Sequence, residues 1–312
     1  MGIQDLPVAL HWIRARWLIL PGLPATPISV HLMLLAGQIC FASLPVAGRL
    51  ALADIPPGAI ALVRTVGGAI VFSAIAWRRG VLRIDRRDAP LLVLCAMLGN
   101  VINQELFIHG LARTTATNAV VIGSTIPVFT ALAAIVFGRE PVRLRRLFGI
   151  AVAFGGVAVL VGAEDLSLSS AHFVGSIMIV INALSYGIYL VIVRPLADRY
   201  DPIALLAFMF LAGIPIVAPI GIHALVVAAH PLTGGDAAFF AFLIAVPTVG
   251  AYTFVQLGLR RAESSLVAAY IYLQPVVAAS GAVLILGEPA SSRLALCGVV
   301  VLAGVWLAAR SR

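Results

Sequence analysis

Lysine is absent from this 312-residue chain, and charged residues of all kinds make up only 11% of it. A soluble domain needs about a quarter of its residues charged to cover its surface, so the composition excludes an ordinary cytosolic enzyme. A chain without lysine also has no phosphate-loop lysine, which excludes ATP-driven pumping by this chain alone. Hydrophobic residues fill 62% of the sequence and the mean hydropathy is +1.08, so the composition indicates a membrane protein.

Cysteine is scarce as well: Cys40, Cys95 and Cys297 each lie inside an apolar run, which argues against disulfides and against a metal cluster. The motifs H-E-x-x-H and G-x-S-x-G are missing, so we expect no catalytic residues, metal or cofactor. An intramembrane enzyme is the least favoured alternative. The net charge of +8 comes from arginines in short clusters between apolar runs, so nucleic acid is not an expected partner.

Ten apolar runs have the length of membrane-spanning helices, about 20 residues each. Strands of a membrane β-barrel would be about 10 residues of alternating pattern, whereas runs such as 150–161 are continuously apolar. The predicted fold class is therefore an all-α polytopic membrane protein. The ten spans are expected near 30–50, 57–77, 90–110, 116–137, 146–163, 172–193, 202–222, 237–257, 265–286 and 293–309.

Residues 1–27 contain an apolar stretch that is too short to span and is interrupted by His11, Arg14 and Arg16. Two interpretations stay open, an interfacial segment anchored by Trp12 and Trp17 or a disordered tail.

The arginines predict the orientation, because an excess of basic residues marks the cytoplasmic side of short loops. With the N-terminus inside, seventeen arginines fall on inner segments, three (Arg49, Arg113 and Arg293) on outer loops, and Arg64 inside a span. Both termini are therefore expected in the cytoplasm.

An internal repeat appears at an offset of 148 residues, where Gly110 to Pro141 aligns without gaps on Gly258 to Pro289. The alignment matches Pro127 with Pro275 and the pair Glu140-Pro141 with Glu288-Pro289. Each repeat holds five spans, and because five is odd, the second copy must enter the membrane from the opposite side. The predicted halves, 28–164 and 165–312, are inverted repeats, an arrangement that secondary transporters use to place a site between two halves.

At these residues the sequence resembles the drug/metabolite transporter superfamily, as a ten-helix protein with two tandem EamA-type domains. The pieces that carry the resemblance are Leu62-Val63-Arg64, Ile126-Pro127-Val128, Gly138-Arg139-Glu140-Pro141, the run from Ala183 to Tyr189, Leu273-Gln274-Pro275-Val276 and Gly287-Glu288-Pro289. The resemblance implies export or facilitated exchange of small metabolites, most often amino acids, in a bacterial inner membrane. It extends to the YddG-like aromatic amino-acid exporters, but Ala36-Gly37-Gln38-Ile39 stands where many relatives have a Trp-Gly pair, which leaves the substrate open.

Polar side chains inside spans are costly and usually face the bundle interior, so they are the candidate substrate-binding residues. At 100° per residue, the third span places an amide-rich stripe on one face and Glu105 and His109 on the other. Interhelical hydrogen bonding is the plainer alternative, and interfacial anchoring is an alternative for Tyr189. The candidates are Gln38, Asn100, Asn103, Gln104, Phe107, Asn182, Tyr186, Thr248, Tyr252, Tyr270 and Gln274, with Phe41 and Pro45 on the Gln38 face.

Arg64 and Glu105 are the ionisable pair of opposite sign well inside spans, both roughly 10 Å below the outer surface at 1.5 Å per residue. Equal depth predicts a structural ion pair, and a proton-coupling role for Glu105 is the alternative. Pro127 and Pro275 are expected near the centres of the fourth and ninth spans, where a kink would serve as a hinge or would simply be tolerated.

The sequence therefore predicts a secondary transporter of small metabolites, amino acids with aromatic or apolar side chains first, working by alternating access. A carrier of nucleosides, sugars or drug-like compounds is the alternative, and a channel is less favoured. The expected partners are a small-molecule substrate and the lipid bilayer; the sequence sets no oligomeric state and allows a monomer.

Overall fold

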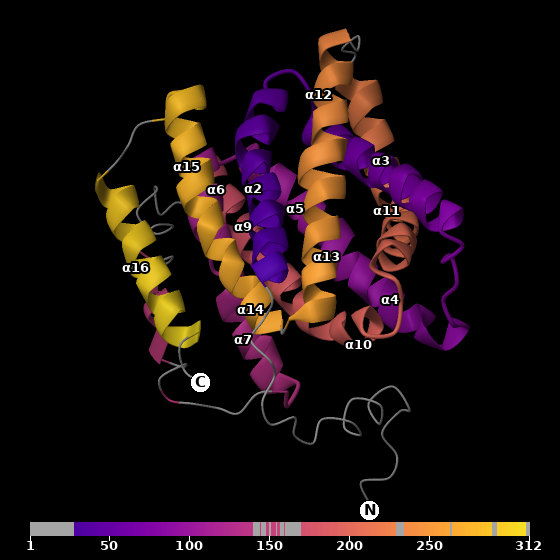
Figure 1. Ribbon diagram of the computed structural model, residues 1–312. Coiled ribbons are helices and arrows are strands. Elements are labelled where there is room, and N and C mark those ends of the chain that lie inside the picture. Colours follow the sequence, from indigo (N-terminus) through magenta and orange to yellow (C-terminus); the bar gives the residue numbers. More distant parts are fainter. Residues whose placement is uncertain are drawn as a thin grey trace, which may run out of the picture.

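The computed structural model describes residues 28–139, 170–228, 234–262, 264–288 and 292–309, with a few positions between 144 and 159. All regular elements in these ranges are helical (Figure 1). Eight helical segments there are long and apolar enough to cross a membrane, and they coincide with the predicted spans one to four and six to nine. The predicted segment 1–27 and most of the predicted fifth span lie outside the described residues.

The first half begins with two long helices, α2 (Ile28–Ala51) and α3 (Pro57–Arg78). A short turn, η1 (Arg86–Asp88), leads into the third span. The third and fourth spans are each divided into shorter helices. The third span consists of α4 (Ala89–Ala96), η2 (Met97–Val101) and α5 (Ile102–Leu111), and the fourth of α6 (Ala116–Gly123) and α7 (Ile126–Val136).

The second half repeats this pattern. The sixth and seventh spans are α9 (Ala171–Ile192) and α11 (Pro202–Ala228), joined through α10 (Arg194–Ala197). The eighth consists of α12 (Gly234–Ile244), η3 (Ala245–Gly250) and α13 (Ala251–Arg261), and the ninth of α14 (Ser264–Ala269), η4 (Tyr270–Tyr272) and α15 (Leu273–Leu286). Helix α16 (Ser292–Ala309) corresponds to the predicted tenth span.

The third and eighth spans are interrupted by π-helical segments at corresponding places. Met97–Val101 of η2, shifted by the repeat offset of 148, falls on the first five residues of η3. A π segment contains one extra residue per turn, which leaves backbone carbonyls without their usual helical partners, and such segments are frequent at functional sites. The predicted stripe assumed 100° per residue throughout, so the π segment changes the register of Asn100 relative to Asn103.

The fourth and ninth spans are broken at their repeat-related prolines. Pro127 lies in the first turn of α7 and Pro275 is the third residue of α15, so each proline follows a break rather than lying inside a continuous kinked helix. Ser124 and Thr125 donate hydroxyl hydrogen bonds to the carbonyls of Val121 and Ile122, which stabilise the break in the fourth span. The predicted location of both prolines near the centres of their spans is confirmed, the break before each proline is an additional finding, and the hinge role stays a prediction.

The first span of each half packs mainly against helices of the other half. Helix α2 packs on α13 and α15 of the second half, and α9 packs on α5, α6 and α7 of the first half, while α3 lies along α11. Figure 1 shows α2 between α15 and α13. The first span of each half therefore completes the other half's group, which gives one group of α2, α13 and α15 and a second of α9, α5, α6 and α7.

Candidate functional site

A small pocket lies between the two groups of helices. Its cavity volume is only about 10 Å³, and none of its lining side chains carries a charge at neutral pH. Besides α2, the pocket is lined by residues of α9, α13, α14, η4 and α15. The lining residues are Gln38, Phe41, Tyr186, Leu190, Val255, Val267, Ile271 and Gln274.

Polar contact in this pocket comes from two amides and one phenol. Gln274 donates its Nε2 hydrogen to Oε1 of Gln38 at 2.6 Å, which ties α15 to α2. Tyr186 lines the pocket, its side chain is 95% buried, and its hydroxyl has no hydrogen-bond partner among the described residues. The ring of Phe41 meets the rings of Tyr186 and Tyr252 edge-on, at centroid distances of 6.3 and 5.3 Å.

A second polar cluster is built on the π segment of the third span. The hydroxyl of Tyr252 donates to the carbonyl of Gly99 at 3.0 Å and to Oδ1 of Asn103 at 3.1 Å. Asn182 donates to the carbonyl of Asn103 at 2.6 Å. Ser185 donates to the carbonyl of Leu98 at 2.7 Å. Side chains of the sixth and eighth spans thus satisfy the carbonyls in and just after η2.

Gln256 and Ser185 were missed as candidates. Gln256 donates to the hydroxyl of Tyr189 at 2.7 Å, and all atoms of this pair are deeply buried, so Tyr189 is not an interfacial anchor. Gln256 follows Tyr252 by four residues, so helical spacing alone would have placed it on the same face. Ser185 carries no such signal, because small hydroxyl residues are common in membrane helices.

Of the predicted residues, Gln38, Tyr186 and Gln274 line the pocket, and Phe107 and Tyr270 lie away from both the pocket and the second polar cluster. Phe107 packs among apolar side chains near Leu52 and Leu111, and Tyr270 is hydrogen-bonded to His31 of α2. Neither lines the pocket.

The expected ion pair between Arg64 and Glu105 does not form. Arg64 donates from Nε to the hydroxyl of Thr248 at 2.9 Å and from Nη2 to the carbonyl of Pro247 at 3.3 Å. Glu105 instead lies 3.3 Å from Nε2 of His109, one turn along its own helix. The prediction of a pair rested on equal depth, and depth does not determine toward which neighbour each side chain points.

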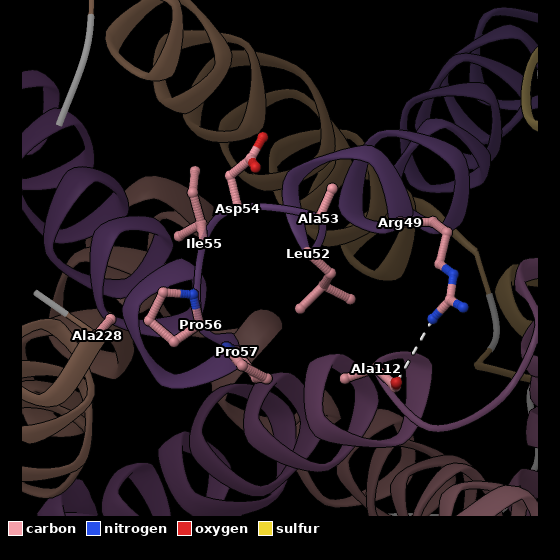
Figure 2. A pocket seen from close by; sticks show the side chains of 9 residues that line it. All are labelled: Arg49, Leu52, Ala53, Asp54, Ile55, Pro56, Pro57, Ala112 and Ala228. Atoms are coloured by element: carbon pink, nitrogen blue, oxygen red, sulfur yellow. Dashed lines mark hydrogen bonds between the residues drawn. The ribbon is translucent and has the colours of Figure 1, made fainter. Parts of the chain in front are cut away.

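Hydrogen bonds join the two helix groups at the end of the molecule where α2 and α15 terminate, which we call the Arg49 end. Arg49, near the end of α2, donates to the carbonyls of Leu111 and Ala112 at the end of α5, at 3.0 and 3.5 Å. A cation is favoured there by the negative end of the helix dipole. Arg49 borders an open cavity of about 540 Å³ that also involves the loop from α2 to α3, and Figure 2 shows its bond to Ala112.

Glu288 forms a second bond between the groups at this end. Gly287 has the left-handed conformation (φ 67°) that ends α15, and it directs the chain toward the start of α6. The Glu288 carboxylate accepts hydrogen bonds from the backbone of Ala116 at 2.7 Å and Thr117 at 3.1 Å, and from the Thr117 hydroxyl. The first backbone N–H groups of a helix favour a negative charge.

At the opposite end, where α9 and α13 terminate, a related arrangement occurs, and we call this the Arg194 end. Arg194 donates to the carbonyl of Ala262, which caps α13, and Ser264 donates to the carbonyl of Leu190 at 2.8 Å. Arg139 donates to the carbonyl of Val191 at 2.7 Å, and burial, followed by the nearby Arg194, lowers the pKa of Arg139. The two arginines are therefore related by the repeat. Arg49, at the end of the first span, bonds the end of the third span of its own half, and Arg194, just after the first span of the second half, does so at the opposite end of the molecule.

Comparison with protein families matches residues 28–162 and again residues 173–310 to the EamA-like transporter family. The chain belongs to this family. It is 27% identical over 281 residues to an uncharacterized transporter of Archaeoglobus fulgidus, covering 89% of this chain and 96% of the relative. It is 28% identical over 254 residues to a probable terminal-alkyne amino-acid exporter of Streptantibioticus cattleyicolor, covering 80% and 82%.

A solved crystal structure has a similar fold, with a TM-score of 0.65 and 21% identity over 90% of this chain and 96% of the other. The chain is therefore a multi-pass membrane transporter with the two-repeat EamA fold.

Proposed function

We propose that this EamA protein is a secondary carrier that exports or exchanges amino acids with aromatic or apolar side chains by alternating access. The observation that carries the proposal is the pocket between two helix groups that are bonded together at both ends of the molecule. Its volume of about 10 Å³ is far smaller than the roughly 300 Å³ typical of the smallest ligand sites. A solute therefore enters only when the bonds at one end open.

The lining of the pocket supports the proposed substrate class. Aromatic and aliphatic side chains surround two amides and a phenol with an unpartnered hydroxyl, a combination suited to an amphipathic solute with an apolar side chain. The amino-acid exporter among the relatives supports the same class. Nucleosides, sugars and drug-like compounds are the alternative.

The test begins with thermal stabilisation of the purified protein by amino acids, nucleosides and sugars. Any stabilising compound is then used in a counterflow assay. Liposomes that contain the protein are preloaded with the unlabelled compound, and the uptake of a labelled trace of the same compound is measured, with protein-free liposomes as the control. A carrier shows transient accumulation above equilibrium, and a channel shows none. Stabilisation by a nucleoside or sugar with no effect of any amino acid would overturn the substrate class.

Proton coupling through Glu105 is part of the same proposal. Glu105 is 91% buried beside His109, so two titratable groups lie together inside the third span. Replacing the carboxylate in Glu105→Gln should remove the pH dependence of exchange while leaving exchange itself in place. An unchanged pH profile in this variant would eliminate Glu105 as the coupling group.

The proposed location is a bacterial inner membrane with both termini in the cytoplasm, supported by the seventeen-to-three distribution of arginines. The proposed partners are the solute and the bilayer. In a variant lacking the three native cysteines, an impermeant thiol reagent applied to intact cells should label Asp236→Cys and spare Arg79→Cys; the opposite labelling would reverse the orientation.

A further inference from the structure

Arg64 is a buried cation without a carboxylate partner. Its side chain is 99% buried about two turns into α3, in the membrane-spanning part of the chain. The groups that accept its hydrogen bonds, Thr248 and Pro247, are neutral, and its Nη1 atom has no partner among the described residues. Ionisable groups inside membrane helices are costly unless they are paired, so an unpaired arginine at this place points to a ligand.

Further unpartnered polar atoms lie at Thr65, the residue after Arg64 on α3, and on the third span, which packs against α3. Thr65 Oγ1, Asn100 Nδ2 and Gln104 Oε1 are buried and make no hydrogen bond within the described chain. Gln104 uses its own amide nitrogen on Asn100 Oδ1, which leaves the Asn100 Nδ2 hydrogens as donors. With Arg64 Nη1 and the Thr65 hydroxyl, the cluster holds more donors than acceptors and a positive charge.

Gly213 of α11 makes room at this cluster. A methyl group at Gly213 would lie 2.6 Å from Asn100 Nδ2 and 3.5 Å from Thr65 Cγ2, so α3, η2 and α11 meet there. Helix α13 connects the cluster to the pocket, because Tyr252 lies one turn beyond Thr248 and its ring contacts Phe41 in the pocket lining. Tyr252 therefore stands between the central pocket and the Arg64 cluster.

Resting on the proposed function, we infer that Arg64, with Asn100 and Thr65, forms a subsite for the carboxylate of the transported solute. Arginine suits a planar carboxylate because its N–H groups bind two oxygens together, and charge-assisted bonds of this kind are the strong ones. The apolar pocket would then hold the solute's side chain. This assignment favours a carboxylic acid over a nucleoside or an uncharged sugar.

The first experiment compares L-phenylalanine with phenylalanine amide, which lacks the carboxylate, by measuring their dissociation constants for the purified full-length protein. Arg64→Gln should weaken phenylalanine binding by about tenfold or more and change amide binding little. Arg113→Gln, which removes an exposed arginine that follows α5 and donates to the carbonyl of His109, is the matched control and should leave both unchanged. Equal weakening of the acid and the amide in Arg64→Gln would contradict the subsite and indicate a purely structural arginine.

Gly213→Ala provides a second variant that retains every charged group. Its added methyl group displaces Asn100 Nδ2, so it should also weaken phenylalanine more than the amide. Selective weakening here would support the subsite even if Arg64→Gln failed to fold, and unchanged selectivity would contradict it.

Acetate, a carboxylate without an amino acid's other groups, tests the carboxylate subsite independently of the proposed substrate class. At equal ionic strength, sodium acetate should raise the thermal unfolding midpoint of the wild-type protein above that in sodium chloride, and Arg64→Gln should abolish the difference. Acetate stabilisation without amino-acid binding would retain the subsite and refute the proposed substrate class. Equal unfolding midpoints in sodium acetate and sodium chloride would overturn the subsite, because the protein would then not distinguish a carboxylate from chloride.

Discussion

Tyr186 and Tyr252 are neighbouring buried tyrosines whose hydroxyl groups have different surroundings. Tyr252 donates to Gly99 and Asn103 and so contributes to the packing of the eighth span on the third. Tyr186 lines the pocket, yet its hydroxyl has no partner within the described part of the chain. The two hydroxyls should therefore contribute differently to stability and to solute binding.

Tyr252→Phe keeps the ring and removes the hydroxyl, leaving the Gly99 carbonyl without its donor. The free energy of unfolding should fall by about 1–2 kcal/mol, because a buried acceptor loses its hydrogen bond. Chemical or thermal unfolding of the purified protein measures this. The control is Tyr200→Phe, since the Tyr200 hydroxyl bonds to Asp88 in a loop and its pKa is raised by burial and then by that bond. A loss no larger than that of the control would contradict the packing role.

Tyr186→Phe should leave the unfolding midpoint unchanged, since no bond within the described protein is lost. If the hydroxyl binds the solute, the Michaelis constant for exchange should rise by about tenfold, because the lost hydrogen bond contributes a binding free energy equivalent to about that factor. Unchanged exchange kinetics would remove Tyr186 from the binding residues, while a large loss of stability would indicate a protein partner.

Sequence reasoning reached Gln38, Tyr186 and Gln274 because polar side chains in an apolar span have few places to go except the interior. Phe41 was also predicted, from its place on the Gln38 face. The aliphatic lining residues, such as Leu190 and Val267, were not predicted, because nothing distinguishes an interior leucine from a lipid-facing one in a continuously apolar run. The role of Gln38, Tyr186 and Gln274 in binding the solute stays a prediction.

At the scale of single elements, the π segments and the breaks at proline determine where polar groups gather. Leu98 and Gly99 in η2 accept bonds from Ser185 and Tyr252 because a π segment frees carbonyls. The predicted positions of the spans were confirmed for the eight that the structure describes as long membrane helices. The π segments were not predicted, because one extra residue per turn leaves composition and hydropathy unchanged.

Gly99→Ala tests the packing of the π segment. A methyl group at Gly99 would lie 2.5–2.7 Å from ring atoms of Tyr189, so the variant should be destabilised by about 1–3 kcal/mol. Gly123→Ala is the matched control, since no atom lies within 4 Å of a methyl group there. Thermal unfolding of both variants measures the difference, and equal stability would mean that η2 adjusts freely to Tyr189.

For the whole molecule, the exchange of first spans between the halves determines which bonds have to break during transport. Because α2 packs with α13 and α15, and α9 with α5, α6 and α7, the bonds of Arg49 and Glu288 join different helix groups at one end. At the other end, the bond of Arg194 joins the segment after α9 to the end of α13, and the bond of Ser264 joins α14 to α9. The repeat was visible in the sequence, but these bonds were not, since they join side chains to backbone carbonyls and N–H groups that any residue provides.

Cross-linking each end separately tests alternating access most directly. In a cysteine-free background, Thr117→Cys with Glu288→Cys places thiols at the Arg49 end, and Leu190→Cys with Ser264→Cys places them at the Arg194 end. A short bifunctional thiol reagent with a reducible spacer joins each pair, and solute exchange in proteoliposomes is the readout. Either cross-link alone should stop exchange, and reduction should restore it; exchange that continues at the full rate with one end completely cross-linked would rule out alternating access through these two ends.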